Sequence, residues 1–224
     1  MLEFKKPEIS DKEWANKCLA HANSMNCEYT FGNLFIWQKS YSTEICKYKD
    51  FLICKWNDDG ITTYSLPLGE GDFTDAVSAI IDYAKSNGET PVIYGITEGY
   101  LGLMQEAFTG KFTYKYDDGN NDYIYSTEKM ASLSGKKYHG KRNHITNFKK
   151  NNPDWSFEKI SKDNIDECLA LHSKWIENKD PDDEDYSLEF EAVKKAFEYF
   201  DELDMVGGLI RVSGEVIAYT LCEP

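Results

Sequence analysis

Long apolar runs are absent from this 224-residue sequence, and its stretches without a polar residue are short, as in Leu34 to Trp37. A helix that crosses a bilayer needs about 20 consecutive apolar residues. The N-terminal segment from Met1 to Pro7 also lacks the apolar stretch of a secretory signal. We therefore expect a protein without a membrane span and with a cytoplasmic location.

Cysteine and histidine are few and scattered. The six cysteines include no C-x-x-C pair, and none of the four histidines has a neighbouring ligand pair at the spacing that zinc requires. A chain of this length needs no disulfide to hold a core. We therefore predict reduced, buried thiols and no structural metal. A Ser-His-Asp or Cys-His grouping with a recognisable local signature is also absent from the sequence.

Basic residues are outnumbered, because 25 lysines and arginines stand against 39 aspartates and glutamates, which gives a net charge of -14. This charge argues against a protein that coats nucleic acid or an anionic membrane with its whole surface. An anionic partner must therefore meet a local patch. The sequence offers one, since the stretch from Lys129 to Pro153 contains six lysines and Arg142 but no aspartate or glutamate.

The apolar content, 41% of the residues with 14% aromatic, is sufficient for a globular core. In the first half, a capping box of Ser10 and Glu13 predicts a helix, which is followed by a second helix, a three-stranded meander and a glycine loop that opens a third helix. A buried strand, a fourth helix and a hairpin around residues 117–120 complete this half. The predicted helices are 10–23, 31–38, 73–87 and 100–108, and the predicted strands are 43–48, 51–56, 61–66, 91–96, 112–116 and 123–125.

A coarser repeat of this order follows, with strands at 155–160, 208–212 and 215–221 and helices at 163–178 and 188–203. The repeated order predicts an α/β (α+β) protein of two like halves, 1–127 and 128–224, each a mixed, mostly antiparallel sheet flanked by helices. The second half stops after its early strands, so we expect it to be truncated. Residues 215–221 would then form an exposed hydrophobic edge that lowers solubility.

The order of elements resembles the GNAT acyltransferase fold, in which a loop after the fourth strand cradles a pyrophosphate. Two motifs, EYTFGNLFIW at 28–37 and LSGKKYHGKRNHI at 133–145, resemble the phosphatidylglycerol lysyltransferase C-terminal domain family, a tandem-GNAT group related to the Fem aminoacyltransferases. The resemblance implies transfer of an aminoacyl group from a charged tRNA to an amine or hydroxyl acceptor, without CoA or another cofactor. The membrane-embedded region of the lipid-modifying members is absent, which leaves the acceptor open.

The glycine loop has two interpretations. Gly69-x-Gly71 before a helix is a turn that lets backbone N–H groups approach a phosphate. CoA-using members of the GNAT fold resemble Gln/Arg-x-x-Gly-x-Gly/Ala here, whereas this chain has Leu66 at the basic or amide position and acidic Glu70 and Asp72 beside the glycines. A CoA-binding loop and a plain turn with a helix cap both remain open.

The basic stretch predicts an amphipathic helix. At about 100° per residue, Tyr138, Ile145 and Phe148 define its apolar stripe. The cations on or beside that stripe are Lys141, Arg142 and Lys149. We therefore expect these cations to lean toward the protein body or a cleft. The candidate contacts for a substrate or phosphate are Lys136, Lys137, His139, Lys141, Arg142 and Asn143.

Arginine is scarce, since Arg142 and Arg211 are the only two. A guanidinium at position 142 indicates a forked contact to a carboxylate or a phosphate. The carboxylate could come from the acidic run 180–185, which is itself either a solvated loop or a lid that binds an amine. His139 and His144 are candidate proton carriers, although a histidine in such a position more often has a solvated or structural role.

The leading hypothesis is an aminoacyl-tRNA-dependent acyltransferase that positions a reactive ester and stabilises its oxyanion. Its partner at the basic helix would be aminoacyl-tRNA or another phosphate-bearing ligand. A CoA-dependent N-acyltransferase and a non-catalytic binding module on a degenerate acyltransferase fold are the alternatives. The sequence identifies neither a catalytic residue nor an oligomeric state.

Overall fold

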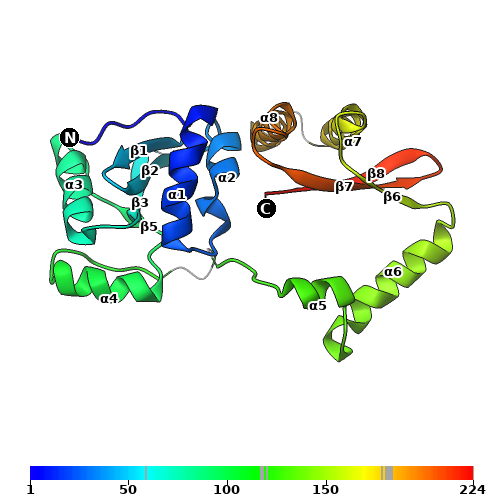
Figure 1. The fold of residues 1–224 in the computed structure, drawn as a ribbon, viewed down its shortest axis with the longest axis horizontal. Coiled ribbons are helices and arrows are strands. Elements are labelled where there is room, and N and C mark those ends of the chain that lie inside the picture. Colours follow the sequence, from blue (N-terminus) through cyan, green and yellow to red (C-terminus); the bar gives the residue numbers. More distant parts are fainter. Residues whose placement is uncertain (59, 117–118, 120, 178, 180–183, 224) are drawn as a thin grey trace. The chain divides into compact units, whose positions relative to one another are not determined.

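The chain divides into two units, Met1–Asn121 and Asp122–Pro224, and each is described by itself. The computed structural model describes residues 1–58, 60–116, 119, 121–177, 179 and 184–223 (Figure 1). The predicted division into GNAT-like halves at residue 127 stays a prediction. Within the described ranges, no helix combines the length and the apolar character that a bilayer crossing requires.

Unit 1 is built on a five-stranded sheet in the order β1-β2-β3-β5, with the short β4 paired to β2. Neighbouring strands are antiparallel except β3 and β5, which run parallel and are connected through helix α3. The elements of unit 1 are η1 (Ile9–Asp11), α1 (Lys12–Ala22), η2 (Cys27–Tyr29), α2 (Phe31–Ile36), β1 (Glu44–Tyr48), β2 (Phe51–Asp58), β3 (Ile61–Ser65), β4 (Leu68–Gly69), α3 (Phe73–Ser86), β5 (Ile93–Tyr94) and α4 (Glu98–Ala107).

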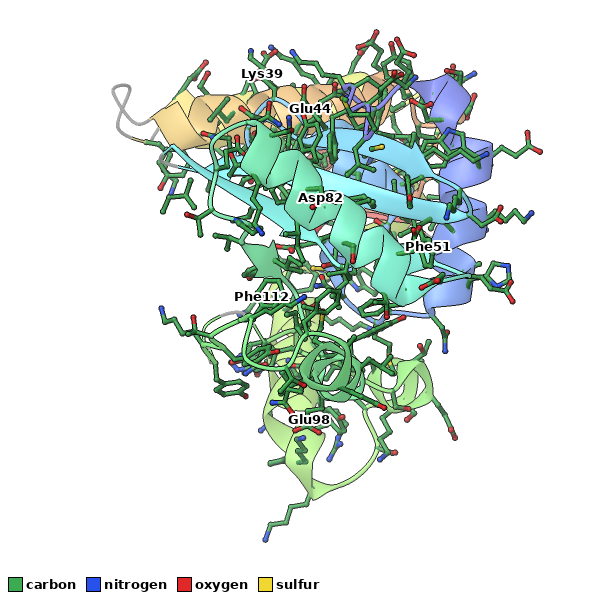
Figure 2. All side chains as sticks on the ribbon, turned by 90° about the vertical axis from the view of Figure 1, so that its left-hand side faces the viewer. Lys39, Glu44, Phe51, Asp82, Glu98 and Phe112 are labelled. Carbon is green, nitrogen blue, oxygen red and sulfur yellow. The ribbon has the colours of Figure 1, made fainter. Side chains whose placement is uncertain are left out.

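Helix α3 covers one face of the first sheet (Figure 2). Ile80 and Ala84 on its apolar stripe pack against Cys46, Ile53 and Tyr64, which come from three adjacent strands. These strand residues lie on one face because side chains alternate along a strand. The apolar periodicity of the sequence therefore placed α3 and the meander correctly.

Unit 2 carries a three-stranded antiparallel sheet in the order β6-β7-β8, with α7 and α8 on one face (Figure 1). Its core is formed by Ile160, Cys168, Phe197 and Leu209. The elements of unit 2 are α5 (Thr127–Ser132), η4 (Lys136–Tyr138), α6 (His139–Asn151), β6 (Ser156–Lys159), α7 (Ile165–Glu177), α8 (Glu184–Glu198), β7 (Val206–Val212) and β8 (Glu215–Cys222). The predicted mixed fold with mostly antiparallel sheets flanked by helices is confirmed.

Arg211 on β7 ties three parts of unit 2 together. Its Nε donates to Glu158 of β6 at 2.8 Å, and its Nη2 donates to Glu167 of α7 at 2.6 Å. Its Nη1 donates to the carbonyl of Gly214 in the β7–β8 turn at 3.1 Å. The hydrogen bonds to Glu167 and Glu158 raise the pKa of Arg211, and the hydrogen bonds from Arg211 lower the pKa of Glu167. Arg211 is therefore the arginine that serves as an internal strut.

The predicted hairpin of 112–116 and 123–125 is wrong, because both segments lack strand pairing. Tyr116 is 79% exposed and Tyr123 is 89% exposed, so neither segment buries the face that a strand needs for stability. Of its predicted turn, residues 117, 118 and 120 lie outside the described residues.

Two local details at helix ends also differ from the prediction. The capping box consists of Glu8 and Asp11 instead of Ser10 and Glu13, because the chain enters α1 through the 3-10 turn η1. The backbone N–H of Glu8 donates to Asp11 at 2.9 Å. Helix α5, which is only one and a half turns long in an exposed segment, was not predicted.

Candidate functional site

The predicted basic helix forms as α6, directly after the turn η4. Gly135 begins this turn with a φ of 92°, a left-handed conformation that glycine adopts without strain. Tyr138 anchors the turn because its side chain is buried, whereas no residue within α6 itself is buried. Further along, the ring of Phe148 contacts that of Trp155 at a centroid distance of 6.3 Å. Helix α6 is thus a largely exposed element fixed at a few points.

Within unit 2, the lysines of α6 do not lean inward, so the prediction is wrong for them. Lys141 is exposed, and Lys149 is exposed with its Nζ 4.7 Å from the ring centroid of Trp155. Ile145 of the apolar stripe is itself 44% exposed. The apolar stripe is too poorly covered to hold these two lysines against the unit, so both face solvent, whereas Arg142 is half-buried.

The candidate residues share one exposed region, which we call the basic surface. It consists of the exposed Lys136, Lys137, His139, Lys141 and Asn143 together with the half-buried Arg142. In the part of the chain that the structure describes, none of its cations pairs with a carboxylate. The first turn of α6 contains no acidic residue and no side-chain cap, so the positive end of the helix adds to the field of the lysines. This arrangement suits an anion.

Arg142 clamps the backbone that leads into the basic surface. Its Nη1 donates to the carbonyl oxygen of Gly135 at 2.9 Å and also to that of Leu133. Leu133 has a φ of 47°, a conformation that costs a non-glycine residue about 1–2 kcal/mol, and the clamp helps to hold it. The acidic run 180–185, a predicted source of a carboxylate partner, lies outside the residues whose side chains are described.

The two candidate proton carriers of this helix, His139 and His144, are both exposed. Nε2 of His139 lies 3.3 Å from Nδ2 of Asn143, one turn further along. This contact brings two of the predicted contact residues together. His144 has no such contact with the other candidate residues.

The glycines of the loop before α3 are required by packing inside the protein. A Cβ on Gly69 would lie 2.1 Å from the carbonyl oxygen of Asp50, and a Cβ on Gly71 would lie 3.1 Å from the ring of Phe51. Both glycines have φ values in the left-handed region, 152° and 136°. Close approach to the β1–β2 turn therefore explains the glycines without a ligand.

The N-terminus of α3 is occupied by carboxylates of the chain itself. Asp72 accepts a hydrogen bond from the N–H of Asp75 at 3.0 Å. The carboxylate of Asp75 in turn accepts from Lys49 at 2.7 Å and from Tyr48 at 2.8 Å. These two hydrogen bonds lower the pKa of Asp75, so it is charged at neutral pH. Negative charge thus already lies where a pyrophosphate would bind.

Sequence reasoning missed a polar cavity of about 420 Å³ in unit 1. Lys39 and Glu44 lie at the same end of the sheet in Figure 2, and both line it. Lys55 at its floor pairs with Glu44, and its Nζ lies 5.0 Å from the ring centroid of Phe4. The full lining is Lys6, Gln38, Lys39, Ser42, Glu44, Lys55, Asn57, Thr62 and Glu89. These residues come from five separate stretches of the sequence, so no local motif predicts them.

Sequence reasoning also missed His172 on α7, which is 8% exposed. Its Nδ1 lies 2.9 Å from the hydroxyl of Tyr219 on β8. The two residues are 47 positions apart, and each sits in an apolar pattern that predicts only core packing. No pattern in the sequence predicts the contact between His172 and Tyr219.

Comparisons with known proteins add two findings. The family described as phosphatidylglycerol lysyltransferase, C-terminal, matches residues 20–224. The structure is similar to the crystal structure of a conserved protein of unknown function from Bacteroides thetaiotaomicron VPI-5482, with a TM-score of 0.91 and 29% sequence identity over 99% of this chain and 75% of that chain. A search of curated proteins found no match.

Proposed function

The chain belongs to the phosphatidylglycerol lysyltransferase C-terminal family, and from that premise we propose that it transfers an aminoacyl group from a charged tRNA to an amine or hydroxyl acceptor. In this proposal the basic surface receives phosphates of the tRNA. The acyl donor is the aminoacyl ester itself, so CoA takes no part.

The observation that carries the proposal is the unneutralised charge of the basic surface. The chain as a whole has a net charge of -14, which repels a polyanion everywhere except at such a patch. Lys137 and Lys141 are exposed point charges without a carboxylate partner among the described residues. Binding of a tRNA to them would release condensed counterions and so gain affinity at low salt.

The geometry of unit 1 favours this reaction over CoA-dependent transfer. A CoA pyrophosphate at the loop before α3 would meet the carboxylates of Asp72 and Asp75 and the exposed Glu70. The chain offers no arginine there, since its two arginines are at 142 and 211. The negative charges of the pyrophosphate and of these carboxylates would repel each other. In addition, the backbone N–H of Asp75, which a phosphate would use, already donates to Asp72.

The proposed transfer requires the protein mainly to position the acceptor beside the aminoacyl ester. The oxygen or nitrogen of the acceptor bonds to the ester carbonyl carbon, and the bond from that carbon to the ribose oxygen breaks. The proton that the acceptor loses ends on the ribose oxygen. Because the ester is already activated, the protein contributes mainly by positioning the reactants and by stabilising the negative charge on the carbonyl oxygen.

The test is transfer of label from tRNAs charged, one at a time, with radiolabelled amino acids. Phosphatidylglycerol vesicles and a soluble amine serve as separate acceptors, and product is measured in the lipid and aqueous phases. Lys137→Glu and Lys141→Glu should each weaken tRNA binding and reduce the slope of log affinity against log salt by about one.

The matched control is Lys85→Glu, which reverses an exposed lysine at the end of α3 in unit 1 that is not part of the basic surface. It should leave the affinity for tRNA unchanged. Saturable micromolar binding of CoA, together with no binding of charged tRNA at low salt, would overturn the proposal.

A further inference from the structure

His172 is held rigidly in the interior of unit 2. Its ring stacks on Phe190 of α8 with a centroid distance of 5.3 Å and an interplanar angle of 9°. Trp175 lies on another side at 5.6 Å, and Tyr219 contacts Nδ1 at 2.9 Å. The imidazole therefore has one orientation, fixed by residues of α7, α8 and β8.

The other ring nitrogen of His172 has no hydrogen-bond partner among the residues that the structure describes. Nε2 is buried and makes no hydrogen bond to any residue that the structure describes. A buried polar atom without a partner costs about 1–3 kcal/mol, and such atoms are rare in folded proteins. The unpaired nitrogen therefore requires an explanation.

Hydrogen-bond accounting decides which nitrogen carries the proton. If Nδ1 donated to the hydroxyl of Tyr219, then the hydroxyl proton and the Nε2 lone pair would both lack partners among the described residues. If the hydroxyl of Tyr219 donates to Nδ1, only the N–H at Nε2 is left without a partner. The second arrangement leaves fewer groups unsatisfied, so Nε2 carries the proton and is a hydrogen-bond donor.

The surroundings keep His172 neutral. Burial lowers its pKa below the ordinary value, and the nearby charge of Glu189 on α8 opposes this only in part. Burial raises the pKa of Tyr219 to about 12, so the hydroxyl keeps its proton. Burial likewise raises the pKa of the Cys168 thiol on α7. At neutral pH the cluster thus presents a single uncharged N–H donor.

We propose that Nε2 of His172 donates a hydrogen bond to the carbonyl oxygen of the aminoacyl ester and stabilises the negative charge that develops there. This inference rests on the proposed aminoacyl transfer. As the acceptor attacks, the C=O electron pair moves onto the carbonyl oxygen, and it returns when the bond to the ribose oxygen breaks. His172 keeps its proton throughout, because the N–H of a neutral imidazole is a weaker acid than a ribose hydroxyl. The ribose oxygen therefore takes its proton from the acceptor and not from His172.

We infer that access to Nε2 passes beside Trp175, because this is a half-exposed side chain whose ring contacts the imidazole. The nitrogen is closed to solvent in this conformation, whereas the Trp175 side chain is 41% exposed and borders the imidazole. Its indole is covered on one face by Lys179, whose Nζ lies 4.5 Å from the ring centroid. Rotation of such an exposed side chain takes picoseconds to nanoseconds, so the ester carbonyl reaches Nε2 when Trp175 turns outward.

The first experiment is kinetic. His172→Phe keeps an aromatic ring on Phe190 but removes the donor, and it should lower kcat by about 10²–10³-fold with little change in KM. His172→Gln retains an N–H donor and should restore part of the loss. The parent rate should not follow the titration of an imidazole between pH 6 and 8, because the donor is neutral throughout. A His172→Phe protein with the kcat of the parent, or a rate that rises with an imidazole pKa, overturns the inference.

The second experiment does not depend on turnover. Nitrogen-15 NMR of the parent, with the His172→Gln spectrum to assign the signal, should show the proton on Nε2. An adenosine carrying an amide-linked amino acid at its 3′ position, a stable mimic of the ester, should shift that nitrogen. A proton on Nδ1, or no shift at saturating probe, overturns the role of His172. Absence of transfer from every charged tRNA, with the shift present, overturns the proposed function alone.

Discussion

Replacement of Arg142 tests whether the basic surface has to be held in shape. The guanidinium bonds two backbone carbonyls, those of Leu133 and Gly135. A hydrogen bond from a charged donor contributes about 1.5–3 kcal/mol when buried, and less here because the contact to Gly135 is exposed. We therefore expect Arg142→Lys, which can serve only one carbonyl well, to loosen residues 133–138 by about 1–2 kcal/mol. Lys137→Glu makes no such change.

Two assays separate the clamp from a direct contact. Hydrogen exchange of the amides of 133–142 should accelerate about 5–30-fold in Arg142→Lys, because lowering the free energy of local opening by about 1–2 kcal/mol raises the open population by that factor. Exchange should stay unchanged in Lys137→Glu. Binding to charged tRNA should weaken in both proteins, but only Lys137→Glu should lower the salt slope by about one. Unchanged exchange together with a lower salt slope in Arg142→Lys would refute the clamp and leave Arg142 as a phosphate contact.

Further predictions concern packing and pH. Gly69→Ala should destabilise unit 1 in urea by several kcal/mol, because its Cβ would meet the carbonyl of Asp50, whereas Gly88→Ala, with open space around it and a φ of 75°, should cost only about 1 kcal/mol. Equal midpoints for the two would contradict this packing argument. Glu167→Gln should lower the melting temperature of unit 2 at pH 7, because it removes the charge that pairs with Arg211. The folded-state pKa of Glu167 is lowered, so the parent holds this stability above about pH 4.5 and loses it as the pH falls through the folded-state pKa, and parent and variant should converge in acid.

The sequence predicted most regular elements because their apolar periodicity is strong. In α3, Ala76, Val77, Ile80 and Ala84 recur at helical spacing, and all four are buried. The strands β1 to β3 were placed to within about two residues for the same reason. Periodicity failed where side chains face solvent on every side, as around Tyr123, since β-propensity has no effect without a surface to cover.

The candidate site was only partly predictable. A run of lysines without carboxylates is visible in the sequence, whereas the exposure of Lys141 and Lys149 was not predicted, because their position beside the apolar stripe indicated an inward orientation. The partner of Arg142 could not be predicted, because backbone carbonyls leave no mark in the sequence. His172 and Tyr219 meet only after α7 packs on the second sheet, so their contact depends on tertiary structure alone.

The connections of Arg211 bear on the order in which unit 2 is completed during synthesis. Strand β6 emerges from the ribosome well before β7, its hydrogen-bonded neighbour in the second sheet, because α7 and α8 lie between them in the sequence. Until β7 is synthesised, Glu158 and Glu167 lack their hydrogen bonds to Arg211. The apolar faces of α7 and α8 likewise lack the strand against which they pack. The helices and β6 of nascent unit 2 can therefore pack together only after β7 has been synthesised. A pause in translation before β7 would prolong the interval in which a chaperone can bind their exposed apolar faces.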